Sequence, residues 1–205
     1  MRLEAVQLSC VRGYKTLFEN LNIELQAGQL LLVEGKNGAG KTSLLKLLTG
    51  LRRPDAGTIL WQGKNITDAE SGYRQSLSWL GHQNPLKEDQ TALENLQMLG
   101  AIRTRNNRCA IEALKTLQLS KFKNKAVKTF SAGMKRRLSL ASLLISETPL
   151  WILDEPQAAL DKAGIALFES LASAHLEQGG MIIMTSHHDI AIANHHLVRL
   201  NLGHD

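Results

Sequence analysis

The chain has 205 residues, of which 43% are hydrophobic and 21% charged, a composition typical of a globular protein with a sizeable core. No apolar run approaches the roughly 18 to 20 residues that cross a bilayer, and residues 1–4 lack the hydrophobic region of a signal peptide, so we expect a cytoplasmic protein. The net charge of +5 would suit an anionic partner, but aromatic residues make up only 4% of the chain, which argues against a stacking surface for nucleic acid.

Strand and helix patterns alternate along most of the chain. The continuous apolar run at residues 30–33 is typical of a parallel strand covered on both faces, and residues 41–49 have the leucine spacing of a buried helix. Strands that alternate with helices indicate a mostly parallel sheet. The other strands are expected at residues 3–8, 21–25, 57–63, 76–81, 150–153 and 181–184.

The segment of about residues 84–130 has a different character from the rest. It contains helix-like stretches at 92–99 and 110–117 and carries most of the local basic charge. We interpret it as a helical lobe inserted into an α/β core, within one domain of residues 1–205. The basic cluster at 103–108 is interpreted as a solvated turn rather than a nucleic-acid site.

A phosphate-binding loop is the strongest local signal. Residues 35–42 read Gly-Lys-Asn-Gly-Ala-Gly-Lys-Thr, the full G-x-x-x-x-G-K-T pattern between a predicted strand and a predicted helix. The glycines let backbone N–H groups surround phosphate oxygens, and the helix N-terminus adds positive potential. Lys41 would reach the β- and γ-phosphates, and Thr42 would offer its hydroxyl to Mg²⁺. A glycine-rich turn without function is the alternative, but it does not explain why strand, loop and helix occur together.

Two acidic residues follow the strand predicted at 150–153. Because ligands bind at the carboxyl ends of strands in open α/β sheets, Asp154 and Glu155 would lie beside the phosphate loop. Asp154 would then hold Mg²⁺, and Glu155 would polarise the attacking water as a general base. On its own, an Asp-Glu pair after a strand is usually a helix cap or a solvated turn. Because this chain also has a phosphate loop, the catalytic and metal-binding interpretation is favoured.

Residues 130–137 contain a serine and a glycine at the start of a predicted helix. Ser131 would cap that helix, and its hydroxyl, the flexible Gly133 backbone and the helix N-terminus together also make an anion site. This run resembles the signature sequence of ABC ATPases, which in that family binds the γ-phosphate of ATP held by the opposite subunit. Ser131 and Gly133 match the pattern, whereas Ala132 replaces a glycine and Met134 replaces the usual glutamine.

Other elements of the ABC family resemblance follow in the same order along the chain. Gln83 matches the glutamine that senses Mg²⁺ and couples to the transport partner. Asp161 lies in the segment that matches the loop crossing the dimer interface, and His187 matches the histidine that contacts the γ-phosphate. The aromatic residue that stacks on adenine has no clear counterpart: either Arg12, through a cation–π contact, or Tyr14 could lie on the base.

The resemblance implies a complete fold and site. The fold would be α/β, a P-loop NTPase nucleotide-binding domain of the ABC type with a mostly parallel core sheet, an N-terminal antiparallel β subdomain and an inserted helical subdomain. The ligands would be ATP and Mg²⁺. The catalytic residues would be Glu155, His187 and Lys41, and the metal-binding residues would be Thr42, Gln83 and Asp154. The nucleotide-binding residues would be Gly35, Lys36, Asn37, Gly38, Ala39, Gly40, Lys41, Thr42, Ser43, Gln83, Ser131, Gly133, Asp161, Arg12 and Tyr14.

Within the ABC family, the chain is similar to the ATP-binding subunits of cytochrome c maturation complexes, long called haem exporters. Trp61, His82, Trp151 and the single-alanine signature carry most of this similarity, and Gln157 departs from it. The similarity implies a homodimer that sandwiches ATP, peripheral on the cytoplasmic side of a bacterial inner membrane. Its partners would be integral permease subunits, and ATP turnover would power haem export or release of a haem-loaded chaperone.

Three alternatives differ in what the chain would do. It could serve a different ABC exporter or importer, which the membrane partner would reveal. A soluble nucleic-acid-linked ABC protein would normally carry a long coiled-coil insertion or two cassettes, and this sequence has neither, so no direct nucleic-acid contact is expected. A catalytically silent module is opposed by the intact Lys41, Asp154 and Glu155. Haem is expected to be handled by the partners rather than bound by this chain.

Overall fold

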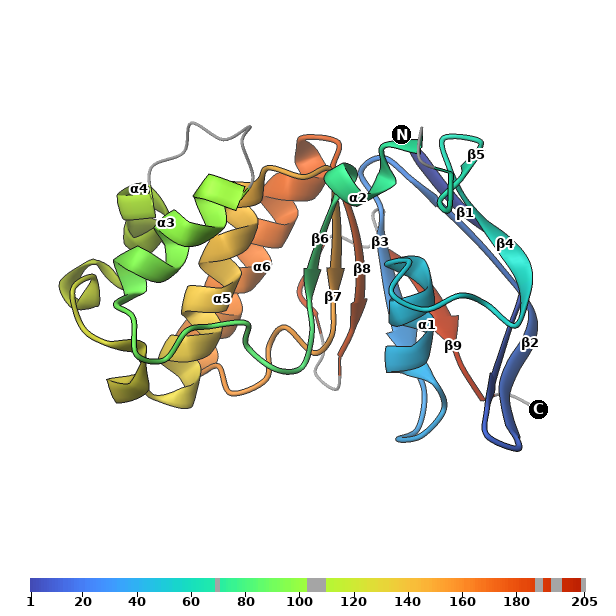
Figure 1. The fold of residues 1–205 in the computed structure, drawn as a ribbon, viewed down its shortest axis with the longest axis horizontal. Helices are drawn as coiled ribbons and strands as arrows, with labels where there is room; N and C mark the ends of the chain where they lie inside the picture. Colours follow the sequence, from blue (N-terminus) through green and yellow to red (C-terminus); the bar gives the residue numbers. More distant parts are fainter. Residues whose placement is uncertain (69–70, 103–109, 187–189, 193–196, 204–205) are drawn as a thin grey trace.

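The computed structural model describes residues 1–68, 71–102, 110–186, 190–192 and 197–203. Figure 1 shows a parallel sheet in the middle, a layer of helices on one face, and helix α1 (Lys41–Leu48) with an antiparallel sheet on the other. The predicted α/β architecture is therefore present, and the parallel strands all end at the lower edge of this view.

The parallel sheet forms the centre of the core. Its strands lie in the order β6 (Leu77–Leu80), β7 (Leu150–Leu153), β8 (Met181–Thr185), β3 (Leu30–Glu34) and β9 (Leu197–Asn201), and all neighbouring pairs are parallel. Successive residues of a strand point to opposite faces, so Leu30 and Leu32 pack with the helices while Leu31 and Val33 pack with the antiparallel side. Burial on both faces explains the continuous apolar runs in the sequence.

The antiparallel sheet lies on the same side of the parallel sheet as α1 (Figure 1). Its order is β2 (Lys15–Gln26), β1 (Arg2–Arg12), β4 (Ala56–Trp61) and β5 (Lys64–Asn65). The strands expected at 3–8 and 21–25 extend into one long hairpin, in which Arg12 pairs with Lys15 next to the turn. This hairpin reaches down to the end of the molecule at which the parallel strands finish (Figure 1).

Helices cover both faces of the parallel sheet. The short α2 (Tyr73–Ser76) precedes β6, and α5 (Ala132–Ser146) and α6 (Lys162–Glu177) pack on the face opposite α1. Outside α5 lie α3 (Ala92–Ile102), α4 (Ala110–Thr116) and the 3-10 turns η2 (Ser120–Phe122) and η3 (Val127–Thr129). The expected helices at 92–99 and 110–117 correspond to α3 and α4, whereas α6 and β9 were not predicted. None of the helices in the described ranges is long and apolar enough to cross a membrane.

Candidate nucleotide site

The phosphate loop joins the end of β3 to the start of α1. Gly40 precedes the helix with φ 102°, and a Cβ at this position would lie 3.1 Å from the Leu17 Cβ, so both the backbone conformation and the space favour glycine. Lys41 is only 8% exposed, and its Nζ donates to the carbonyl oxygens of Gly35 at 2.6 Å and Lys36 at 3.4 Å. The ammonium therefore lies inside the curve of the loop, where phosphate oxygens could replace these carbonyls.

Oxygen ligands for a divalent cation meet where α1 begins and β7 ends. The Thr42 Oγ1 donates to the Asp154 Oδ2 over 2.9 Å, and the Thr185 Oγ1 donates to the Asp154 Oδ1 over 2.8 Å. Asp154 is 3% exposed, so its carboxylate is held at one place on the sheet edge. A hydroxyl and a carboxylate in contact are the hard oxygen donors that Mg²⁺ prefers, and this pair fits the ion.

Glu155 directs its carboxylate toward the same place from a strained backbone. Its φ of 49° is left-handed, a conformation that costs a non-glycine residue roughly 1 to 2 kcal/mol. Its N–H donates to the Thr185 Oγ1 over 2.9 Å, and its Oε2 lies 3.8 Å from the His82 Nδ1. Glu155 lines one pocket together with Lys41 and Thr42, so it could act on a water beside a phosphate there.

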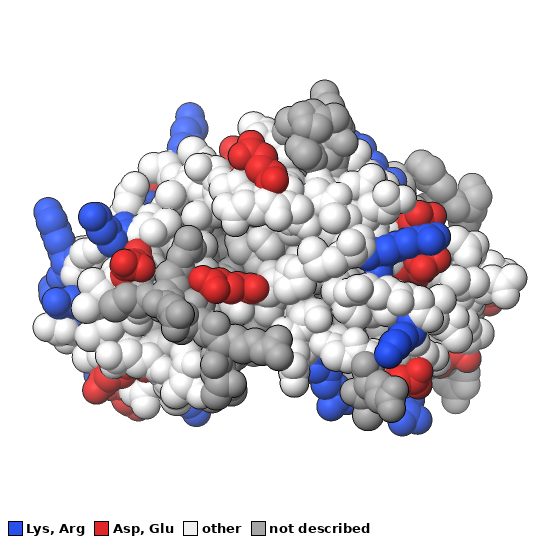
Figure 2. All heavy atoms as spheres, turned by 90° about the horizontal axis from the view of Figure 1, so that it is seen from above, with Lys and Arg blue, Asp and Glu red and all other residues white. Residues whose placement is uncertain are grey.

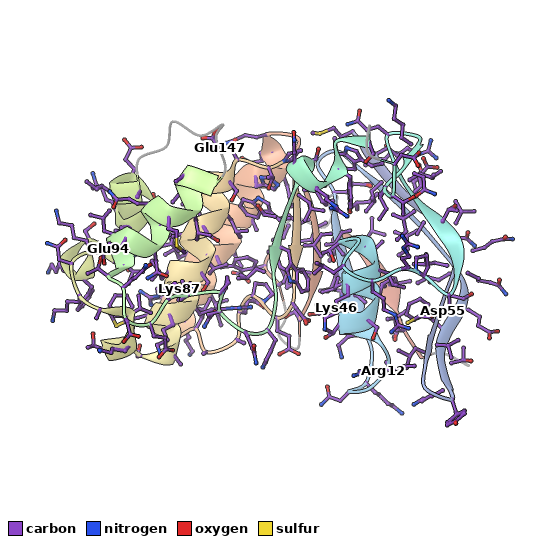
Figure 3. The ribbon with its side chains drawn as sticks, in the orientation of Figure 1. Arg12, Lys46, Asp55, Lys87, Glu94 and Glu147 are labelled. Atoms are coloured by element: carbon purple, nitrogen blue, oxygen red, sulfur yellow. The ribbon has the colours of Figure 1, made fainter. Side chains whose placement is uncertain are left out.

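The same pocket extends to the β1–β2 hairpin. Arg12, Lys15 and Leu17 line it on that side, opposite the phosphate loop. Figure 3 places Arg12 at the end of the molecule where the loop enters α1. Tyr14 is fully exposed and does not line the pocket. Of the two residues considered for adenine stacking, the structure brings only Arg12 to the pocket.

The signature segment begins α5 at the same edge of the sheet. The Ser131 Oγ accepts from the Met134 N–H over 3.2 Å, the capping contact expected from the sequence. A Cβ added at Gly133 would lie 2.9 Å from the Ala159 carbonyl oxygen, so the helix start is pressed against the loop after β7. None of the signature residues lines the pocket that Lys41, Thr42 and Glu155 share.

Asp161 caps the next helix instead of facing the phosphate loop of its own chain. Its Oδ1 accepts from the Gly164 N–H over 2.8 Å and from the Arg137 Nη2 over 2.5 Å. The Gly164 hydrogen bond is the largest cause that lowers the pKa of this carboxyl, followed by the Arg137 contact. This pair also links the signature helix α5 to α6.

Gln83 and His187 are two further residues of the sequence-based set. Gln83 is exposed on the loop after β6, and no hydrogen bond joins it to Thr42 or Asp154 in the described part of the chain. His187 lies outside the described residues. The preceding Ser186 donates from its Oγ to the Oε1 of the buried Gln157 over 2.9 Å, which fixes the end of β8 against the loop after β7.

Sequence reasoning missed Arg136 and Thr185. Arg136 is 2% exposed, and burial is the main cause that lowers its pKa to about 10, so the guanidinium stays charged at neutral pH. Its position one turn before Leu140, on the apolar face of α5, was a signal available in the sequence. Thr185 ends β8, the parallel strand next to β7. The rule that ligands bind at the carboxyl ends of parallel strands, which identified Asp154, could therefore also have identified Thr185.

Comparisons with known proteins place this geometry in context. A profile of the family described as ABC transporter matches residues 18–158. Three proteins named cytochrome c biogenesis ATP-binding export protein CcmA are similar along nearly the whole chain. The Vibrio cholerae protein is 42% identical over 203 residues, with 98% of both chains covered. The Escherichia coli K12 protein is 43% identical over 200 residues, which cover 98% of this chain and 96% of that protein. The Dechloromonas aromatica protein is 44% identical over 205 residues, which cover 98% of this chain and 100% of that protein.

Solved structures support the fold. A putative ABC transporter ATP-binding protein from Pyrococcus furiosus has a TM-score of 0.84 at 24% identity, with 98% of both chains covered. A dimeric ATP-binding cassette solved in a post-hydrolysis state with ADP and Pi has a TM-score of 0.80 at 21% identity, covering 98% of this chain and 97% of that one. The α/β fold of the ABC type expected from the sequence is thus confirmed.

Proposed function

This chain belongs to the ABC transporter family, and from that premise we propose that it is the ATP-hydrolysing subunit of a membrane complex for cytochrome c biogenesis. ATP turnover would drive haem export or the release of a haem-loaded chaperone. The observation that carries this assignment is the similarity to the cytochrome c biogenesis proteins across nearly the entire chain, rather than across the ATPase motifs alone.

The proposed chemistry is hydrolysis of the γ-phosphoryl bond of ATP. Glu155 takes a proton from the attacking water, and Lys41 and His187 stabilise the charge that develops on the phosphoryl oxygens. A bound Mg²⁺, held by Thr42 and Asp154 with Gln83 nearby, would neutralise charge on the phosphates. The contact between Thr42 and Asp154 and the shared pocket of Lys41 and Glu155 support this assignment.

We propose that two copies of the chain complete each site. The pocket of one chain is lined by the phosphate loop, Glu155 and the hairpin, and it lacks the signature residues. Ser131 and Gly133 of a second copy would supply a hydroxyl and backbone N–H groups to the γ-phosphate from the opposite side. Asp161 would lie near the same interface.

The partners follow from the same proposal. Integral permease subunits of the cytochrome c maturation complex would hold this chain on the cytoplasmic side of a bacterial inner membrane, and the lobe of α3 and α4 would dock on them. Haem would be handled by those partners. A role with nucleic acid is not favoured, because on the face seen in Figure 2 basic and acidic side chains are interspersed rather than gathered into a basic stripe.

The test is an affinity purification of the tagged protein from detergent-solubilised membranes, with the partners identified by mass spectrometry. Recovery of haem-handling membrane subunits would support the cytochrome c role, and recovery of another permease would keep the ATPase and discard the haem assignment. As a functional arm, wild type should restore haem-bound periplasmic cytochrome c in a strain that lacks the gene. The Lys41→Ala variant should not restore it, because that change removes the ammonium from the phosphate loop.

A further inference from the structure

One buried guanidinium joins three parts of the nucleotide site. The Arg136 Nη2 donates to the carbonyl oxygens of Asp154 at 2.8 Å and Glu155 at 2.7 Å, and its Nε donates to that of Pro156 at 3.1 Å. Its Nη1 donates to the Gly81 carbonyl oxygen at 3.0 Å and to the Asn84 Oδ1 at 3.3 Å. All five N–H donors of the side chain are therefore used.

These acceptors lie on two separate loops. Three belong to the loop after β7, which carries Asp154 and Glu155, and two belong to the loop after β6, on either side of Gln83. The guanidinium itself comes from α5, five residues after Ser131 at the helix cap. One rigid planar group thus fixes the spacing between the catalytic loop, the Gln83 loop and the signature helix.

The location of Arg136 is costly unless its bonds are all made. It is nearly completely buried, and its contacts are neutral carbonyl and amide oxygens rather than a carboxylate ion pair. Burying a cation is unfavourable, and the nearby Asp154 and Glu155 carboxylates offset only part of that cost, because the pKa of Arg136 stays lowered. The geometry fits a role in holding backbone.

Glu155 is the residue that most needs such support. Its left-handed φ of 49° is sparsely populated by residues with a side chain, and this conformation aims the carboxylate at the phosphate pocket. Arg136 holds the Glu155 carbonyl, while Thr185 holds its N–H. The peptide groups on both sides of the carboxylate are therefore fixed from different elements.

We infer that Arg136 is a positioning residue for ATP hydrolysis, which holds Glu155 and the Gln83 loop in register with the signature helix. This inference rests on the proposed role of Glu155 as the general base. If contact with a second copy shifts the N-terminus of α5, Arg136 transmits that shift to the loops after β6 and β7, because it is hydrogen-bonded to both. The nucleotide pocket has no lining atom from Arg136, so the residue affects the chemical step rather than ATP affinity.

The test uses Arg136→Gln and Arg136→Lys in the full chain, assembled with its membrane partners. Lysine keeps the charge and the aliphatic stem but cannot form five planar hydrogen bonds to two loops. We expect kcat to fall by about tenfold or more in both variants, with the Kd for ATP within about threefold of wild type. Arg2→Gln, which removes an exposed arginine paired with Glu4 and Glu24, is the matched control and should leave both values unchanged.

A double-variant measurement separates positioning from general stability. In a Glu155→Gln background, adding Arg136→Gln should lower the residual turnover by less than about twofold, because the group that Arg136 positions is already absent. Near wild-type kcat in either folded single variant would overturn the inference. The inference would also be overturned if kcat and ATP binding fell together, and only in proportion to the fraction of folded protein measured by thermal unfolding.

Each variant remains informative on its own. If Arg136→Gln does not fold, folded Arg136→Lys carries the same expectation of reduced kcat at unchanged ATP affinity. Failure of the premise would look different, since Glu155→Gln alone would then keep near wild-type turnover. If Glu155→Gln is inactive and both Arg136 variants are fully active, only the positioning role is wrong.

Discussion

Thr42 and Asp154 are 112 residues apart in the chain, yet the Thr42 hydroxyl donates to the Asp154 Oδ2 over 2.9 Å. The contact arises because α1 starts just after β3 ends and Asp154 follows directly on β7, at the same edge of the parallel sheet. Asp154 also accepts from Thr185 on β8, so its two oxygens are oriented by two different elements. The pair is in place for a divalent cation before any phosphate binds.

The first prediction concerns the Thr42 hydroxyl. Thr42→Ala should lower Mg²⁺-dependent ATP hydrolysis by about tenfold or more and shift half-saturation to higher Mg²⁺, because one hard oxygen ligand is lost. Thr42→Ser keeps the hydroxyl and should stay close to wild type. Turnover measured across a Mg²⁺ titration checks this, and an alanine variant with an unaltered Mg²⁺ dependence would contradict the metal assignment.

The second prediction separates binding from chemistry at Glu155. Glu155→Gln should reduce turnover in the assembled complex by roughly 10²- to 10⁴-fold, since the amide cannot accept a proton from water. ATP binding should persist, because the phosphate loop and Arg12 are untouched. Glu147→Gln is a suitable control: this glutamate also has a left-handed φ, of 44°, but it is exposed and caps the C-terminal end of α5 (Figure 3), away from the signature residues at the other end of that helix. Turnover of Glu155→Gln near that of the control would refute the catalytic role.

The third prediction concerns the adenine base. Arg12→Ala should raise the Kd for ATP by about 3- to 10-fold, the range expected for loss of a cation–π contact. Tyr14→Ala should leave the Kd unchanged, because Tyr14 is fully exposed and outside the pocket. Binding of a fluorescent ATP analogue measures both. A larger effect of Tyr14→Ala than of Arg12→Ala would assign the stacking role to the tyrosine.

The sequence was sufficient for the centre of the site because its signals are local. The phosphate loop is a continuous pattern, and Asp154 follows an unmistakable apolar strand, so one rule about parallel sheets brings the two together. For Arg136 the sequence contained only a weak signal, its position on the apolar face of α5. A basic residue on a helix normally lies in solvent, and only the approach of the loops after β6 and β7 buries this one.

The missed helix α6 and the undecided stacking residue also have physical reasons. The buried face of α6 contains Phe168, Ala172 and Leu176. Because alanine is only weakly hydrophobic, the helical periodicity of this face is weak in the sequence, and the helix was not predicted. Tyr14 was a reasonable candidate for stacking because aromatic residues usually perform it. The hairpin turn, with Gly13 at φ 63°, places Tyr14 in solvent outside the pocket, and the choice between Tyr14 and Arg12 stays a prediction.

The last prediction concerns stability at low pH and a pair of rings far from the nucleotide. His175 on α6 stacks on Trp151 of β7, with ring centroids 3.9 Å apart and planes 8° from parallel. Burial lowers the pKa of His175 from 6.5 to about 4, although the backbone carbonyl groups nearby act in the opposite direction. The folded protein therefore keeps this imidazole neutral over a pH range in which the unfolded chain protonates it.

Because the unfolded state binds the extra proton between about pH 6.5 and pH 4, acidification through this window favours unfolding. We expect the free energy of unfolding to fall by about 1 to 2 kcal/mol from about pH 7 to about pH 5 through this group, allowing for its partial exposure. The His175→Phe variant keeps the ring stack but has no group that titrates. Between the same two pH values, its free energy of unfolding should therefore fall by about 1 to 2 kcal/mol less than that of wild type. Urea unfolding of both proteins at the two pH values measures the difference, and identical pH dependences would show that His175 titrates normally in the folded state.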